Sequence, residues 1–330
     1  MTRARKKRVI SLPPEFKNRV AEIPRETWTF GRALESFARH HRVKGTREST
    51  IKWYMRCLDD FKRFCEEARG IAEATQVRRE DIEEYILSCR EQNLKPTSIN
   101  GRIRSVRAFF NFLESQGALR TNPAKGISLV RHTEPVVPTF TEDHVRRLLE
   151  QPDLSTFAGL RDYTIMLLLL DTGVRIGELL RARREDVVSE GGYPAYLVIR
   201  NPKNQKERVL PLSPKTQGVL RLYSEALDRL FGPDSPLFPN QEGEPISKRT
   251  VQQRIAAYGR RAGLSGVRVS PHTFRHTFAK FWIMEGGDVL SLQEILGHAD
   301  LEMVRRYARM FTPDLKRKHE RFSPVTRKGF

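Results

Sequence analysis

Hydrophobic residues recur every three to four positions along the first part of the chain, from Trp28 to about Arg131. This spacing puts them on one face of a helix, so helices are predicted throughout the segment. A further helix is predicted to begin at Pro96, because proline suits the first helical position, and to end near Gly117. The clearest periodic runs are Thr50, Ile51, Tyr54, Leu58, Phe61 and Phe64, and then Ile82, Tyr85, Ile86 and Cys89.

The helix that begins at Pro96 combines an apolar face with interleaved arginines. The arginines are Arg102, Arg104 and Arg107. Any one of them alone is best interpreted as a solvated residue on a core helix, whereas the set favours a helix that contacts phosphate groups. The apolar positions are Ile99, Ile103, Val106, Phe109, Phe110 and Leu113.

A second pattern follows the proline-containing stretch His132 to Pro138, which is predicted to be an extended linker because proline biases its neighbours away from helix. Helices are predicted from Thr141, with acidic residues in the first turn, through Leu149, and from Leu160 to Leu170. Two short β-like runs, Tyr196–Arg200 and Arg208–Leu212, flank a polar stretch and predict a hairpin.

From Thr216 onward the chain is predicted to be mostly helical, with breaks at Gly232-Pro233, at Gly263 to Pro271 and at Gly286-Gly287. The predicted fold is therefore mainly α, with a small antiparallel sheet in its second, mostly helical domain. The predicted divisions are a basic, flexible segment 1–27, a helical domain 28–131, a linker 132–138 and a mixed domain 139–330.

The net charge of the chain indicates what kind of partner it binds. The 330 residues are enough for two domains, and 59 Lys and Arg against 40 Asp and Glu give a formal net charge of +19. Residues 1–140 hold 28 basic and 17 acidic residues, and residues 141–330 hold 31 and 23, so a basic tail on a neutral enzyme does not explain the excess. An excess spread over both parts favours a polyanionic partner, nucleic acid above all.

Other features exclude several classes of protein. The longest purely apolar run, Ile165 to Leu170, is far shorter than a membrane span, and no secretory hydrophobic segment follows the basic residues of the N-terminus. Three cysteines, Cys57, Cys65 and Cys89, cannot all pair and fall in predicted helices, which indicates a reducing cytoplasm. A membrane protein, a secreted disulfide scaffold and a disordered tail are therefore excluded.

Several polar residues stand at positions that packing alone does not explain. Arg175 and Glu178 follow the apolar helix in Asp171-Thr-Gly-Val-Arg-Ile-Gly-Glu-Leu-Leu180, where Gly173 allows a tight turn. His272 and Arg275 are three residues apart and so share a helix face. His298 follows Leu296-Gly297, and Tyr307 comes nine residues later. Each feature alone has an ordinary structural interpretation.

Taken in order, these segments resemble the tyrosine recombinase family, the phage integrase and Xer-type site-specific recombinases. The family pattern is an Arg in a Thr-Gly-x-Arg turn, a hairpin Lys, His-x-x-Arg, Leu-Gly-His and a downstream Tyr, and every part has a counterpart here. The resemblance covers residues from about Trp28 to Arg131 as a SAM-like core-binding domain and from about Thr139 to Tyr307 as a catalytic domain.

The resemblance implies a reaction in which DNA strands are cut and rejoined through a covalent 3′-phosphotyrosine and a Holliday junction. Tyr307 would be the nucleophile, and Arg175, His272, Arg275 and His298 would contact the phosphate, with Glu178 orienting its neighbours. The hairpin lysine would protonate the leaving 5′-oxygen. When the hairpin is aligned on the family's Lys-x-Arg, Lys203 takes the position of the catalytic lysine, and Lys206 is the alternative. Pro202 and Asn204 stand where the family usually has glycines.

The implied partners are double-stranded DNA and further copies of the chain, as a tetramer on DNA, with no membrane and a location in the cytoplasm beside the nucleoid. No cofactor is implied, and His272 and His276 lack a third ligand for zinc. Two alternatives stay open: a type IB topoisomerase-like nicking and closing enzyme, and a catalytically inert DNA-binding module. The family also suggests that the tail after Tyr307, with Phe311, Leu315, Phe322 and Val325, docks on a neighbouring copy.

Overall fold

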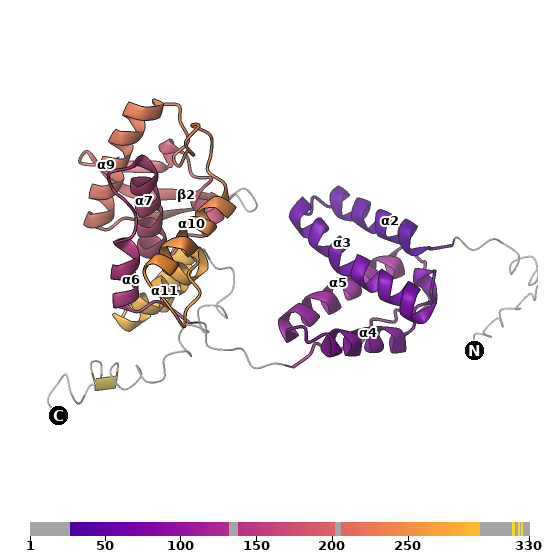
Figure 1. Ribbon diagram of the computed structural model, residues 1–330. Helices are drawn as coiled ribbons and strands as arrows, with labels where there is room; N and C mark the ends of the chain where they lie inside the picture. Colours follow the sequence, from indigo (N-terminus) through magenta and orange to yellow (C-terminus); the bar gives the residue numbers. More distant parts are fainter. Residues whose placement is uncertain are drawn as a thin grey trace, which may run out of the picture. The chain divides into compact units, whose positions relative to one another are not determined.

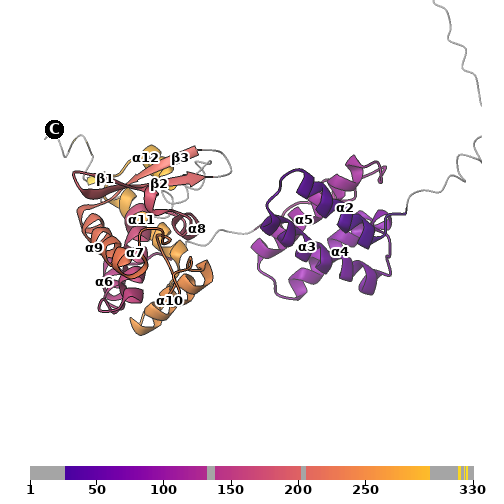
Figure 2. The ribbon, with the colours of Figure 1, turned by 90° about the horizontal axis from the view of Figure 1, so that it is seen from above.

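The computed structural model of the protein describes residues 27–131, 138–201, 206–297, 319–320, 323 and 325. The chain divides into two compact units, Met1–Glu134 and Pro135–Phe330 (Figures 1 and 2). Helices dominate both units, and one small antiparallel sheet lies in the second, so the predicted fold class is confirmed. The predicted N-terminal segment and the linker lie almost wholly outside the described residues, so the exact domain limits stay a prediction.

The first unit is built around helices α2 to α5. A π-helical turn, Phe64–Ala68, extends α3, and a short 3-10 turn, Ala74–Gln76, precedes α4. The Thr29 hydroxyl caps α2 by accepting from the Arg32 amide at 3.4 Å, and Pro96 begins α5 as the sequence predicts. The helices are α2 (Phe30–Val43), α3 (Glu48–Arg63), α4 (Arg79–Glu91) and α5 (Pro96–Ser115).

Phenylalanine side chains form the centre of this first unit. Phe37, Phe61, Phe109 and Phe110 are at most 1% exposed, and the rings of Phe37 and Phe109 meet edge to face with centroids 5.8 Å apart. Burial of each such side chain contributes about 1.5–3 kcal/mol, so the periodic aromatic positions hold the helices together.

Two of the three cysteines, Cys65 and Cys89, belong to this aromatic core. Cys57, Cys65 and Cys89 are all free and buried. Burial raises the pKa of Cys65 to about 12, so its thiol stays protonated at neutral pH and is a poor nucleophile. The cysteines therefore act as small apolar residues here.

The second unit is organised around α7 (Phe157–Thr172), which packs against α9, α10 and α11 (Figure 1). Its leucine-rich run is buried on all sides, which is why the sequence shows a continuous apolar stretch there. None of the helices in the described ranges is both long and apolar enough to cross a lipid bilayer. The other helices are α6 (Glu142–Leu149), α8 (Ile176–Leu179), α9 (Pro214–Phe231), α10 (Lys248–Arg261), α11 (Pro271–Met284) and α12 (Val289–Leu296).

The sheet has the order β1-β2-β3, with antiparallel neighbours. The predicted hairpin corresponds to β2 (Tyr193–Asn201) and β3 (Lys206–Pro211), while the edge strand β1 (Val187–Glu190) was not predicted. A strand of this length is too short to show a period, and its residues are mostly exposed. Leu197 and Leu210 pair across β2 and β3 and are fully buried.

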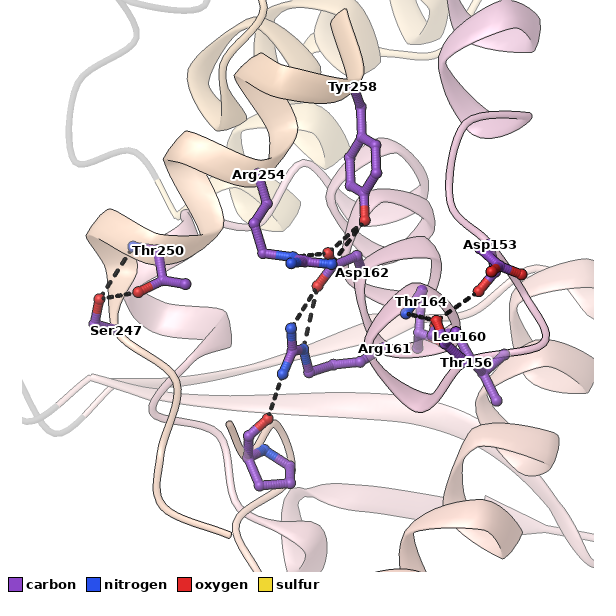
Figure 3. A network of polar contacts seen from close by, with 12 residues as sticks. Asp153, Thr156, Leu160, Arg161, Asp162, Thr164, Ser247, Thr250, Arg254 and Tyr258 are labelled. Atoms are coloured by element: carbon purple, nitrogen blue, oxygen red, sulfur yellow. Dashed lines mark hydrogen bonds and ion pairs between the residues drawn. The ribbon is translucent and has the colours of Figure 1, made fainter. Parts of the chain in front are cut away.

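A buried polar network fastens α10 to α7 (Figure 3). The carboxylate of Asp162, 3% exposed, accepts from the guanidinium of Arg161 at 3.0 and 3.1 Å and from the Tyr258 hydroxyl at 2.6 Å, and it also accepts from Arg254. Arg161 donates further to the Pro239 carbonyl at 2.8 Å, which ties in the loop before α10. This network fixes the helix that leads into α11.

Candidate active site

The first predicted arginine stands in the turn that leaves α7. Gly173 adopts a left-handed φ of 60°, and a Cβ there would lie 2.4 Å from a ring carbon of Phe278 and 2.8 Å from a methyl carbon of Leu296. Only glycine therefore fits this turn. The turn delivers Arg175 to the N-cap of α8, where its amide donates to the Glu178 carboxylate at 3.3 Å.

The second predicted arginine comes from α11, which begins at Pro271 with Ser270 as its cap. Arg275 is 4% exposed, and its guanidinium donates to the Gly173 carbonyl at 2.6 Å and to the Leu296 carbonyl at 2.8 Å. These two contacts orient the guanidinium through neutral oxygens and so do not neutralise its charge.

The two predicted arginines meet at one oxygen atom. Arg175, 38% exposed, donates to the same Leu296 carbonyl at 3.5 Å and to Glu178 at 3.1 Å. Residues one hundred positions apart in the chain thus place two guanidinium groups together, one buried and one open to solvent. Such a pair suits an anion with two oxygens, since guanidinium matches phosphate geometry and stays protonated.

The Glu178 side chain lies beside both Arg175 and Arg208 of β3. Burial alone would raise the pKa of Glu178, but the hydrogen bond and charge of Arg208, with those of Arg175, lower it below its ordinary value. Glu178 is therefore ionised at neutral pH and fixes the positions of its cations.

His272 lies one turn before Arg275 on α11. Partial burial, followed by the positive charges of Lys248, Arg275 and Arg175, lowers the pKa of His272 below its ordinary value of 6.5. The imidazole is therefore neutral at pH 7 and able both to accept and to donate a proton.

In the DNA-free protein we expect His272 to titrate below pH 6.5, and Lys248→Met to raise its midpoint because one neighbouring cation is removed. NMR of histidine labelled with ¹³C at Cε1 measures the midpoint, and the spectrum of a His272→Gln variant identifies the signal among the eight histidines. A midpoint at or above 6.5, or one that Lys248→Met leaves unchanged, would contradict the expectation.

The structure thus brings together Arg175, Glu178, His272 and Arg275. Lys203, His298 and Tyr307 lie outside the described residues, as do Phe311, Leu315 and Phe322 of the predicted docking tail. No group of three or more His, Cys, Asp or Glu side chains that could hold a metal ion occurs among the residues that the structure describes.

Two residues of this site were missed by sequence reasoning. Arg208 was noted only as the last residue of the Lys-x-Arg pattern, although its side chain is 11% exposed and contacts Glu178. Lys248 was not singled out, because nothing in the sequence relates the start of α10 to a histidine 24 positions later. The sequence did contain an indication for Arg208: it is a basic residue at a strand position that faces inward.

The arginines of α5 in the first unit occupy different surroundings. Arg102 forms an ion pair with Asp60 at 2.7 Å and donates to the Tyr85 hydroxyl at 2.9 Å. Arg104 is exposed and Arg107 half-buried. These two lie three residues apart and share a helix face, on which the structure shows no ion pair for either among the described residues.

Two family models match the chain. The model described as Phage integrase family matches residues 138–312, and the model described as Phage integrase, N-terminal SAM-like domain matches residues 34–117. Among curated proteins, the tyrosine recombinase XerD of Listeria innocua is 29% identical over 285 residues, which is 85% of this chain and 94% of that protein. The tyrosine recombinase XerC of Thermodesulfovibrio yellowstonii is 29% identical over 301 residues, 89% of this chain and 97% of that protein.

Solved structures share the fold. The XerH site-specific recombinase bound to a palindromic difH substrate, in a post-cleavage complex, has a TM-score of 0.71 with 19% identity and covers 88% of this chain and 84% of its own. A lambda integrase tetramer bound to a Holliday junction has a TM-score of 0.68 with 18% identity and covers 88% and 82%.

Proposed function

Because the chain belongs to the phage integrase family and is thereby a tyrosine-type site-specific recombinase, an enzyme that breaks and rejoins DNA strands, we propose that its reaction takes place at Arg175 and Arg275. The observation that supports this assignment is the meeting of the two guanidinium groups at the Leu296 carbonyl. Arg275 is held in place before any substrate arrives, so little reorganisation is needed when charge develops.

The chemistry explains the choice of residue types. A phosphodiester under attack concentrates negative charge on its non-bridging oxygens, and preorganised cations stabilise that charge most in the transition state. In the proposed reaction the Tyr307 oxygen bonds to phosphorus while the bond to the 5′-oxygen breaks, which leaves a 3′-phosphotyrosine. The tyrosine proton passes to neutral His272, and Lys203 gives a proton to the 5′-oxygen, while His298 donates to the phosphate.

The covalent intermediate makes the reaction reversible without an external energy source. The phosphotyrosine bond preserves the energy of the phosphodiester, so a 5′-hydroxyl from another strand can attack it and release Tyr307. Two such exchanges in succession pass through a Holliday junction. We therefore assign no cofactor to the reaction.

The proposed partner is double-stranded DNA, bound by both basic units. We propose Arg104 and Arg107 as the phosphate contacts of α5; Arg102, whose charge is already paired with Asp60, would play a lesser part. One structural relative was solved as a tetramer on a Holliday junction, and we propose the same assembly on DNA for this chain, in the cytoplasm beside the nucleoid.

A trapping experiment tests the proposed function. The protein is incubated with DNA that flanks its own gene, covalent protein–DNA complexes are collected under denaturing conditions, and the attached ends are sequenced. A nicked duplex built on the site so found should trap a covalent adduct, and paired intact sites should yield Holliday junctions.

Other outcomes separate the alternatives. Absence of any adduct would favour the inert DNA-binding module. Relaxation of supercoiled DNA by adducts at scattered sites, with no exchange between duplexes, would favour the topoisomerase-like enzyme.

A further inference from the structure

We propose that Arg208 is a positioning residue: it holds Glu178, and through Glu178 the guanidinium of Arg175, against the end of α12. This inference deepens the proposed function and rests on it. Arg208 lies on β3 opposite Ile199 of β2, and its side chain turns inward, 11% exposed.

The Glu178 carboxylate divides its two oxygens between the two arginines. One oxygen accepts from Arg175 Nη1 at 3.1 Å, and the other accepts from Arg208 Nη2 at 2.5 Å and from the Arg175 amide at 3.3 Å. Two guanidinium groups on one carboxylate attract it from two sides, so Glu178 cannot move toward either without losing contact with the other. Arg208 thus limits the positions that Arg175 adopts.

The other contacts of Arg208 are with the last turn of α12. Its Nε donates to the Ile295 carbonyl at 3.0 Å, next to the Leu296 carbonyl that accepts from Arg175 and Arg275. The last carbonyls of a helix have no partner within it and carry partial negative charge, so they attract cations. Arginines from three separate elements therefore converge on one helix terminus.

Gly297, the residue after this helix terminus, leaves room for the Arg208 guanidinium. Gly297 has a left-handed φ of 62°, and a Cβ there would lie 2.8 Å from Arg208 Nη1 and 3.1 Å from its Cζ. The guanidinium therefore lies against bare backbone. A lysine at position 208 would place a single nitrogen where a forked group now contacts both Glu178 and Ile295.

The test compares Arg208→Met and Arg208→Lys with Arg200→Met. Arg200 is a matched control because it stands in the same hairpin and pairs with carboxylates, yet it is 51% exposed and contacts Asp186, Glu185 and Glu207 instead of the site. We expect Arg208→Met to cleave a nicked site about 10- to 100-fold more slowly in a single turnover at saturating protein, as loss of an orienting neighbour typically does. The Kd for the site should change less than about threefold, and Arg200→Met should change neither quantity.

Two further readouts separate positioning from a purely structural role. The losses from Arg208→Met and Glu178→Gln should not multiply in the double variant, since both act on Arg175 through one contact. Cleavage by Arg208→Met should also fall as the pH is lowered from 7.5 to 5.5, more than in the wild type, because the pKa of Glu178 rises when its main cation is lost. Glu178→Gln in the same background should remove this extra pH dependence.

Several outcomes would overturn the inference. They are wild-type cleavage by Arg208→Met, losses that multiply in the double variant, and an unchanged pH profile. If Arg208→Met does not fold, Arg208→Lys decides: full cleavage by it refutes the need for a forked donor, and a loss at unchanged Kd and Tm supports it. Absence of an adduct with the wild type would instead be a failure of the proposed function.

Discussion

Tyr307→Phe should abolish the covalent protein–DNA adduct while leaving the Kd for the recombination site unchanged. The substitution removes one oxygen atom, which in the proposed reaction is the atom that bonds to phosphorus. Loss of a nucleophile from an otherwise intact site typically lowers turnover by 10⁴- to 10⁶-fold, which places the remaining cleavage below detection. The amount of covalent adduct is measured by trapping on a nicked duplex, followed by denaturing gel electrophoresis.

Tyr193→Phe supplies the control for this experiment. Tyr193 lies in the same unit, on β2, and is 50% exposed, so removal of its hydroxyl should leave adduct formation as in the wild type. Peptide mapping of the wild-type adduct should recover the nucleotide on the peptide that contains Tyr307. An adduct that persists in Tyr307→Phe would show that another residue attacks the phosphate.

Arg275→Lys should reduce single-turnover cleavage by at least about 10²- to 10³-fold, the usual cost of removing one preorganised donor from a developing oxyanion. Lysine keeps the charge but has one nitrogen, so it cannot serve the Gly173 and Leu296 carbonyls and a phosphate oxygen together. The Kd for DNA should change much less, since in the proposed complex both basic units contact the DNA backbone.

The contribution of Arg275 to stability is measured with a different substitution. Arg275→Met leaves two buried carbonyl contacts unmade, and each such loss costs about 1–3 kcal/mol, so its free energy of unfolding should fall by a few kcal/mol. Chemical denaturation measures this loss, and Arg229→Lys, at an exposed position of α9, is the control for both experiments. Normal cleavage by Arg275→Lys would contradict the role assigned to the buried guanidinium.

Local patterns were sufficient to predict the helices, because each depends on residues close together in the chain. The period from Thr50 to Phe64 predicts α3, and the proline at 96 predicts the start of α5. The strand β1 was missed because its stability comes from pairing with β2, and its own residues show no period. The burial of α7 on every side likewise depends on four partner helices, α6, α9, α10 and α11.

For the candidate site too, local motifs could be predicted from the sequence, whereas contacts between distant segments could not. The sequence singles out Arg175 and Arg275 as candidates because each stands in a local motif, but their shared contact with Leu296 depends on three segments meeting in space. Arg208 and Lys248 were missed for that reason. Arg102 is a different case: its contacts with Asp60 and Tyr85 were not expected from the sequence, and its contact with DNA stays a prediction.

The end of α12 also sets the order in which the site is completed during synthesis. A ribosome releases Arg175 and Arg208 long before Leu296, and until that carbonyl emerges both arginines lack the helix terminus that holds them. Domains generally fold in the order in which they are made, so the first unit is expected to form while the second is unfinished. In the proposed reaction, a nascent chain therefore cannot cut DNA before its synthesis has passed both residue 296 and the nucleophile, Tyr307.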